Sequence, residues 1–214
     1  MQMFRDKHHE VDPLWHVQLV LLGTIILQLA LPDSLTLLPR YVLPALELVC
    51  MVALQFVTPK KAVFESSLRR VVILALIVAV LLANVSSLEL VLTALFSTGK
   101  NDAPHLLLAA VDIYITNLVM FALFFWEMDN GGPGLRRGNG DETRDFLFPQ
   151  QSAGHRKWFP TFFDYLYVSS TNATAFSPTD TLPLSRRAKF LMSIEALVSL
   201  LIVVLVTARA VNVL

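Results

Sequence analysis

The sequence has little charge, a single cysteine and no excess of either sign of charge. Only 16% of its 214 residues are charged, whereas a soluble domain typically carries about 25%. The 17 basic and 17 acidic residues give a formal net charge of zero, and no Lys/Arg cluster is large enough to indicate nucleic-acid binding. Because Cys50 has no second cysteine to pair with, an internal disulfide is excluded.

Recognisable catalytic and metal-binding motifs are missing as well. The sequence contains no Gly-x-Ser-x-Gly, no His-Glu-x-x-His and no phosphate-binding loop. His8 and His9 are adjacent and would point in different directions on a helix, so a solvated N-terminal tail is favoured over a metal site. We therefore expect no enzymatic activity, no cofactor and no metal.

Long apolar runs are what the sequence has in abundance, because 55% of its residues are hydrophobic. A helix that crosses about 30 Å of hydrocarbon needs roughly 20 apolar residues. Runs of about this length alternate with short polar segments, which is typical of a polytopic membrane protein. The pattern predicts an all-α transmembrane helical bundle, multi-pass in a cell membrane and surrounded by the lipid bilayer. The predicted spans are 13–31, 41–57, 71–96, 106–126 and 190–213.

The order of segments divides the chain into two parts. The second part contains a polar segment rich in glycine and arginine, for which we predict a flexible, water-facing loop. An aromatic segment follows that is too short to span a membrane and begins at Pro160 and Thr161, a good helix start. The predicted divisions are an N-terminal tail 1–12, an N-terminal transmembrane bundle 13–100 and a hairpin module 104–214 with its polar loop at 129–157.

The hairpin module has the order of a cation-channel pore: long span, loop, short helix, irregular polar stretch, long span. Five features recur at pore-module spacing, namely Asp180, Pro183, Lys189, Glu195-Ala196-Leu197 and Ala208-Arg209. With these residues, 106–213 resembles the two-span pore module of the potassium-channel superfamily. The resemblance implies a short re-entrant helix before the last span, and a tetramer, since one hairpin alone encloses no pore.

The departure from that family lies in the filter, which typically reads Thr-Val-Gly-Tyr-Gly-Asp. Neither filter glycine is present here, although Gly supplies the positive φ that lets successive carbonyls face an ion. Pro178 cannot adopt that conformation because its ring fixes φ near −65°. Monovalent cations would have to be met by hydroxyls and carboxylates instead. The filter-like residues are Thr174, Ala175, Phe176, Ser177, Pro178, Thr179 and Asp180.

Two other functions stay open beside a channel-like protein. The hairpin could be kept as a scaffold in a non-conducting or sensor subunit, in which case 177–180 is simply a turn followed by a helix cap. A small proton-coupled transporter would instead use Asp112, which shares a helix face with Thr116. Interhelical hydrogen bonding is the structural alternative for each such residue. The supporting residues are Asp112, Glu195, which is placed to brace the short helix from behind, and Arg209, which is expected to reach the interface.

The expected orientation contains a conflict. The positive-inside rule places the basic loops in the cytoplasm, which with five spans puts the C-terminus outside. A pore module of the familiar kind has the opposite orientation, and the resemblance favours that one. A break near 84–87 would divide 71–96 into two short helices and give six crossings.

Overall fold

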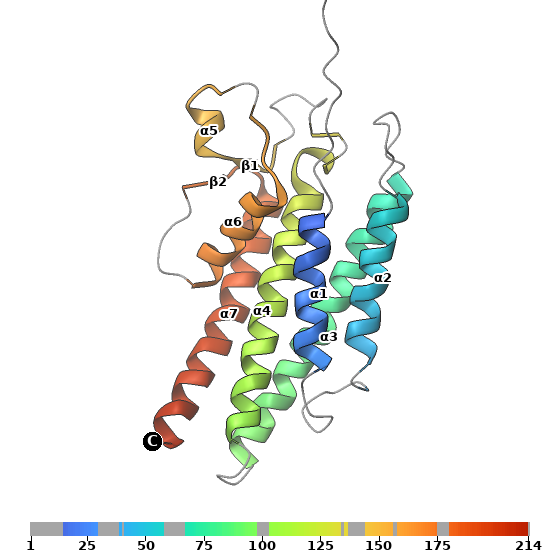
Figure 1. The fold of residues 1–214 in the computed structure, drawn as a ribbon. Helices are drawn as coiled ribbons and strands as arrows, with labels where there is room; N and C mark the ends of the chain where they lie inside the picture. The colour runs from blue at the N-terminus through green and yellow to red at the C-terminus, as the bar shows by residue number, and fades with distance from the viewer. Residues whose placement is uncertain are drawn as a thin grey trace, which may run out of the picture.

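The computed structural model describes residues 15–29, 39, 41–57, 67–97, 103–133, 135–136, 144–155, 158–174 and 180–213. Within these residues the molecule is helical apart from short turns and one two-stranded antiparallel ladder (Figure 1). The elements are α1 Trp15–Leu29, α2 Val42–Val57, α3 Ser67–Ser97, α4 Ala103–Met128, the 3₁₀ turn η3 Asp129–Gly131, β1 Phe146–Leu147, α5 Pro149–Ser152, α6 Phe162–Thr174, β2 Leu182–Pro183 and α7 Arg186–Val213.

The all-α prediction is confirmed, and each predicted span coincides with a helix. By length and composition, two helical segments of the described chain could cross a membrane, Arg70–Val91 and Leu106–Gly131. α1 and α2 contain shorter apolar stretches, so the prediction of five or six spans goes beyond what helix length supports. The break that six crossings required is absent, because α3 runs unbroken through Asn84.

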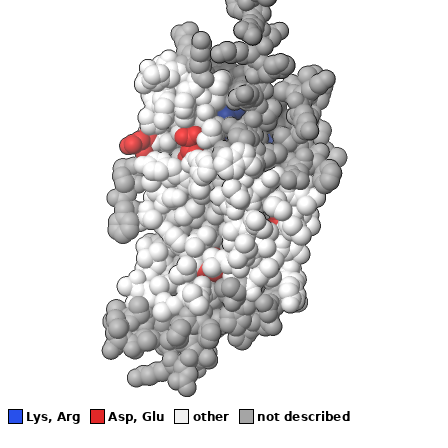
Figure 2. All heavy atoms as spheres, viewed as in Figure 1, with Lys and Arg blue, Asp and Glu red and all other residues white. Residues whose placement is uncertain are grey.

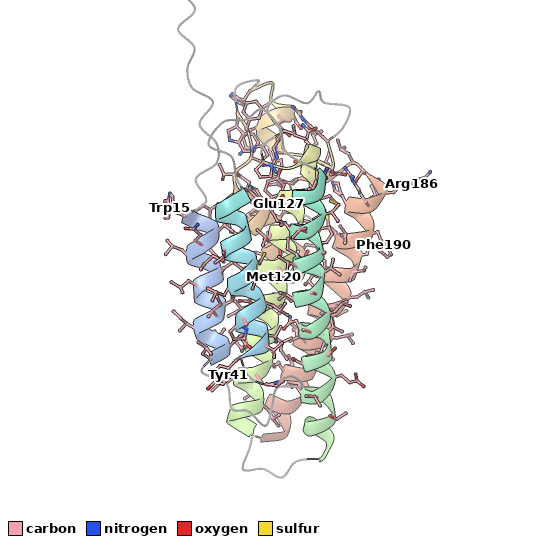
Figure 3. All side chains as sticks on the ribbon, turned by 90° about the vertical axis from the view of Figure 1, so that its right-hand side faces the viewer. Trp15, Tyr41, Met120, Glu127, Arg186 and Phe190 are labelled. Atoms are coloured by element: carbon pink, nitrogen blue, oxygen red, sulfur yellow. The ribbon has the colours of Figure 1, made fainter. Side chains whose placement is uncertain are left out.

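Helices α1 to α4 pack as a four-helix bundle in which each helix contacts its neighbours in the chain, and α1 also contacts α4 (Figure 1). α6 and α7 pack against the far side of α4. The core of the bundle is apolar, and Met120 of α4 lies at its middle (Figure 3). Buried core side chains include Leu21, Cys50, Ile77, Met120 and Phe125.

The outer surface of the helices is apolar over most of their length. Figure 2 shows the middle of the molecule almost entirely without charged side chains. Trp15 and Tyr41 are exposed and lie at opposite ends of the α1–α2 hairpin (Figure 3). An exposed apolar surface of this extent marks a membrane or protein contact, and aromatic side chains at its two edges are typical of membrane interfaces.

The end of α4 is set by three consecutive residues with positive φ: Asn130 at 52°, Gly131 at 89° and Gly132 at 96°. Asn and Gly are the residues that adopt this conformation at least cost. The sequence therefore stops the helix here and turns the chain back over the bundle.

The polar segment after α4 differs from the water-facing loop that the sequence predicted. In its described part, the side chains of Asp129, Arg136, Asp145 and Phe146 are buried. The reason is a set of long-range contacts: the Asp129 carboxylate accepts hydrogen bonds from the backbone N–H groups of Asp145 and Phe146, at 2.8 and 3.2 Å. The described residues of this segment therefore form a folded cap over one end of the bundle.

Candidate functional site

The short helix α6 begins where the sequence predicted, directly after Pro160 and Thr161. Its first turn is capped by Asp164, whose carboxylate accepts hydrogen bonds from the Thr161 backbone N–H at 2.7 Å and the Thr161 hydroxyl at 2.9 Å. A carboxylate is favourable at this end of a helix because it satisfies free N–H groups and the helix dipole. The hydrogen bonds of Asp164 therefore fix the residue at which α6 begins, next to the folded cap.

α6 then descends beside α4 and α7 (Figure 1). The Ser169 hydroxyl donates a hydrogen bond to the Leu118 carbonyl of α4 at 2.7 Å. Leu118 lies about 15 Å along α4 from its end at Met128, at a rise of 1.5 Å per residue. α6 therefore reaches partway down the bundle and ends there, at Thr174.

Glu195 of α7 holds the lower half of α6. Its carboxylate is fully buried and accepts hydrogen bonds from the Ser169 hydroxyl and from the Asn172 side-chain amide, the latter at 2.7 Å. Asn172 also donates to the Met192 carbonyl at 2.8 Å. Glu195 of α7 therefore contacts α6 on the side that faces α7.

The upper half of α6 is held by Tyr165, whose hydroxyl donates to the Asp129 carboxylate. The Arg136 guanidinium lies over the Tyr165 ring, 4.8 Å from its centroid, and its Nε is 3.8 Å from an Asp129 oxygen. Arg136 also donates to the Pro160 and Trp126 carbonyls. These contacts join the end of α4, the cap and α6 in one buried network.

After α6 the chain returns to the end from which α6 descended. β2 pairs with β1, with Leu182 opposite Leu147, and the Leu184 N–H donates to the Asp145 carbonyl at 2.7 Å. Arg187, at the start of α7, donates two hydrogen bonds to the Asp145 carboxylate, at 2.6 and 2.7 Å, and these bonds raise the pKa of Arg187. α7 therefore begins at the end of the bundle where α6 also begins.

Of the filter-like residues, the structure describes only Thr174 and Asp180. Thr174 ends α6 and Asp180 precedes β2, and both side chains are exposed. Residues 175–179 lie outside the described residues. Arg209 is part of α7, but its side chain is also outside the described set. Glu195 thus contacts the last turns of α6 near Thr174, whereas Asp180 lies next to β2 at the cap end.

A second polar cluster lies inside the α1–α4 bundle, and the sequence alone did not identify two of its members, Thr24 and Gln28. Glu47 of α2 is fully buried and accepts hydrogen bonds from the Thr24 hydroxyl and the Gln28 amide, both at 2.6 Å. Gln28 also donates to the Thr116 hydroxyl of α4 at 3.2 Å. Thr24 and Gln28 could have been noticed as polar residues within an apolar run. Their partners could not be predicted, because the sequence does not show which helices are neighbours.

Asp112 lies one helical turn from Thr116 and is 5% exposed. Its Oδ1 atom is buried without a hydrogen-bond partner among the described residues, as is Oε1 of Gln28. Nearby, Asn84 donates to the Ile113 carbonyl at 2.9 Å, and Asn117 donates to the Ser199 hydroxyl at 3.2 Å. Asp112 therefore belongs to the α1–α4 bundle and not to the α6–α7 site.

Both sites, the one around Glu195 and the one around Glu47, consist of carboxyl, hydroxyl and amide groups that form hydrogen bonds. No group of three or more His, Cys, Asp or Glu that could hold a metal occurs in the part of the chain that the structure describes. Two ion pairs lie at the cap, one between Arg136 and Asp129 and one between Arg187 and Asp145.

No protein-family model, curated protein or solved structure matches this chain.

Proposed function

We propose that this chain is a channel-like, multi-pass integral membrane protein in which several copies together form a cation pathway with a non-standard filter. The observation that carries the proposal is the path of the chain around α6. α6 descends partway along the bundle beside α4 and α7, and β2, which follows it, lies again at the end where α6 began. Non-helical backbone at membrane depth is tolerated where it lines a cavity or is buried in protein. A helix that crosses half of the membrane and is followed by a polar turn must therefore be buried in protein or line a cavity.

The outward face of α7 supports association of several copies. An exposed stripe runs down the helix with alternating steps of four and three residues, the spacing of a helix–helix seam. Figure 3 shows Arg186 and Phe190, its first members, pointing away from the rest of the molecule. The stripe also carries two hydroxyls, which are uncommon where a helix faces only lipid. Its members are Arg186, Phe190, Ser193, Leu197, Leu200, Val204 and Thr207.

A tetramer would place the α7 stripe and the turn after α6 around one axis. Hydroxyl and carboxylate oxygens would then face the pathway, among them Thr174 and Asp180. Ligands of this kind suit hydrated or partly hydrated monovalent cations, and the pathway would lack the stacked carbonyls that strip water from potassium.

Ion flux through liposomes that contain the purified protein tests the proposal. We expect uptake of Na⁺ or K⁺ in wild type and an altered rate in Asp180→Asn. Glu89→Gln is the matched control, because Glu89 is an exposed acidic residue on α3, which does not form the α6–α7 site. Absence of flux for both cations in wild type would overturn conduction and favour the non-conducting scaffold.

The symmetry axis is tested by oxidative cross-linking. Cys50 is buried, so a cysteine introduced at an exposed position reports on its own surroundings. Ser193→Cys, on the α7 stripe, is expected to cross-link copies of the chain in the membrane. Leu82→Cys on the exposed face of α3 is the control and is expected to stay monomeric. Cross-linking at Leu82 but not at Ser193 would contradict the proposed assembly.

A further inference from the structure

The cluster inside the α1–α4 bundle has a property that hydrogen bonding within it does not explain. Two of its buried oxygens, Oδ1 of Asp112 and Oε1 of Gln28, have no donor among the described residues. Both side chains are at least nine-tenths buried. A buried polar atom without a partner costs roughly 1–3 kcal/mol, and acceptors are satisfied only by a donor or by a cation.

The two free oxygens lie on adjoining groups. Gln28 donates from its amide nitrogen to the Thr116 hydroxyl at 3.2 Å, so its carbonyl end is close to Thr116. Asp112 precedes Thr116 by four residues on α4, which places both side chains on the same face of that helix. The Thr116 hydroxyl is therefore a neighbour of both side chains, and its oxygen has the chemistry of a third ligand.

The cluster contains two carboxyl groups and no basic side chain from the described parts of α1, α2 or α4. Glu47 and Asp112 are both acidic, and the hydrogen bonds of Glu47 come from the neutral donors Thr24 and Gln28. No Lys or Arg occurs between residues 15 and 29, 41 and 57, or 103 and 128, the described parts of α1, α2 and α4. An ionised group at this depth of a bundle is costly unless it is paired.

We infer that Asp112, Gln28 and Thr116 form a binding site for a small monovalent cation, such as Na⁺, within the α1–α4 bundle. A single positive charge is favoured because both oxygens of Glu47 already accept hydrogen bonds, which leaves Asp112 as the one carboxylate free to coordinate. Divalent cations require more charged ligands or several retained waters. The site lies outside the α6–α7 module, so it does not depend on whether that module conducts.

Thermal unfolding of the purified full-length protein in detergent tests this site without any flux measurement. The Tm is measured in chloride salts of Na⁺, Li⁺, K⁺ and choline at matched ionic strength. A ligand that binds only the folded state raises the Tm in a saturable way. We expect such a rise with at least one alkali cation relative to choline. Equal Tm values in all four salts at every concentration would overturn the inference.

Two variants separate cation binding from a purely structural role. Asp112→Asn keeps the size of the side chain and removes the charge, so we expect the half-saturating cation concentration to rise at least about ten-fold. Its Tm in choline should equal or exceed that of wild type, because an unpaired buried charge is lost; a structural hydrogen-bonding role predicts a fall instead. Glu89→Gln, an exposed acid of the same bundle, should retain the wild-type response.

Should Asp112→Asn fail to fold, Thr116→Val removes a neutral ligand from the same site. The rise in Tm with cation should be weaker in Thr116→Val than in wild type. Glu89→Gln, measured beside it, should show the wild-type rise. An unaltered response in Asp112→Asn or Thr116→Val would contradict the assignment.

Discussion

The contact between Glu195 and α6 makes the sharpest prediction, because one side chain of α7 satisfies two donors on the short helix. The Ser169 hydroxyl and the Asn172 amide both donate to its carboxylate. Each donor has a second acceptor: Ser169 has the Leu118 carbonyl and Asn172 has the Met192 carbonyl. Loss of Glu195 therefore removes two hydrogen bonds between α6 and α7 without leaving either donor unpaired.

The expected magnitude for Glu195→Ala follows from these two bonds. Interhelical hydrogen bonds in membrane proteins contribute about 0.6 kcal/mol on average and up to about 1.7 kcal/mol each. Two of them give about 1–3 kcal/mol, which corresponds to a roughly 5- to 150-fold increase in local opening of α6. Glu195→Gln should cost less, because its carbonyl can accept from Asn172 while its amide donates to the Ser169 oxygen.

Amide hydrogen exchange resolves the effect by segment. In Glu195→Ala, exchange in 162–174 should accelerate within the expected range, while exchange in α1 and α2 should match wild type. Ser199→Ala is the matched control: Ser199 lies one turn further along α7 and accepts from Asn117 of α4, so α6 should be unaffected. Unchanged exchange in α6, or an equal increase throughout the protein, would refute the bracing role of Glu195.

Three further outcomes are expected. Tyr165→Phe removes the hydroxyl that donates to Asp129 and should lower the free energy of unfolding by about 1–2 kcal/mol in a denaturant titration; no loss would mean that the contact is dispensable. Gly132→Ala should cost about 1–3 kcal/mol, because its φ of 96° is strained for any side chain, whereas Gly23→Ala, in a helix with open space around it, should be neutral or stabilising. Ser152→Cys, exposed on the cap, should react with a membrane-impermeant maleimide only after the cytoplasmic face is opened; labelling of intact cells would place the cap outside.

The sequence predicted the helices well because each is encoded locally. Apolar runs located α1 to α4 and α7, and Pro160 with Thr161 located the start of α6. Glu195 was also predicted to lie behind the short helix, and in the structure its carboxylate accepts hydrogen bonds from Ser169 and Asn172 of that helix. The resemblance to potassium-channel pore modules stays a prediction. The flux and cross-linking experiments test the conduction and the assembly that it implies.

Contacts between distant segments were not predictable in the same way. The segment after α4 reads as a polar loop, yet Asp129 pairs with backbone groups of 145 and 146, which no local pattern reveals. The partners of Glu47 depend on α1 and α2 packing side by side, with α4 against α1. Sequence shows that such polar residues need partners, but the choice of partner follows from the packing of whole helices.

The orientation of the protein follows from joining the charge pattern to the path of the chain. The unbroken α3 removes the sixth crossing that could have reconciled the positive-inside rule with a pore module of familiar orientation. The described basic side chains gather at the cap end, where Arg70 donates to the Met128 carbonyl and Arg187 pairs with Asp145. Basic residues beside span ends set orientation during insertion, before such pairs form. We therefore expect the cap to be cytoplasmic and α6 to enter the bilayer from that side, which is the opposite of the orientation that the sequence led us to expect for a pore module.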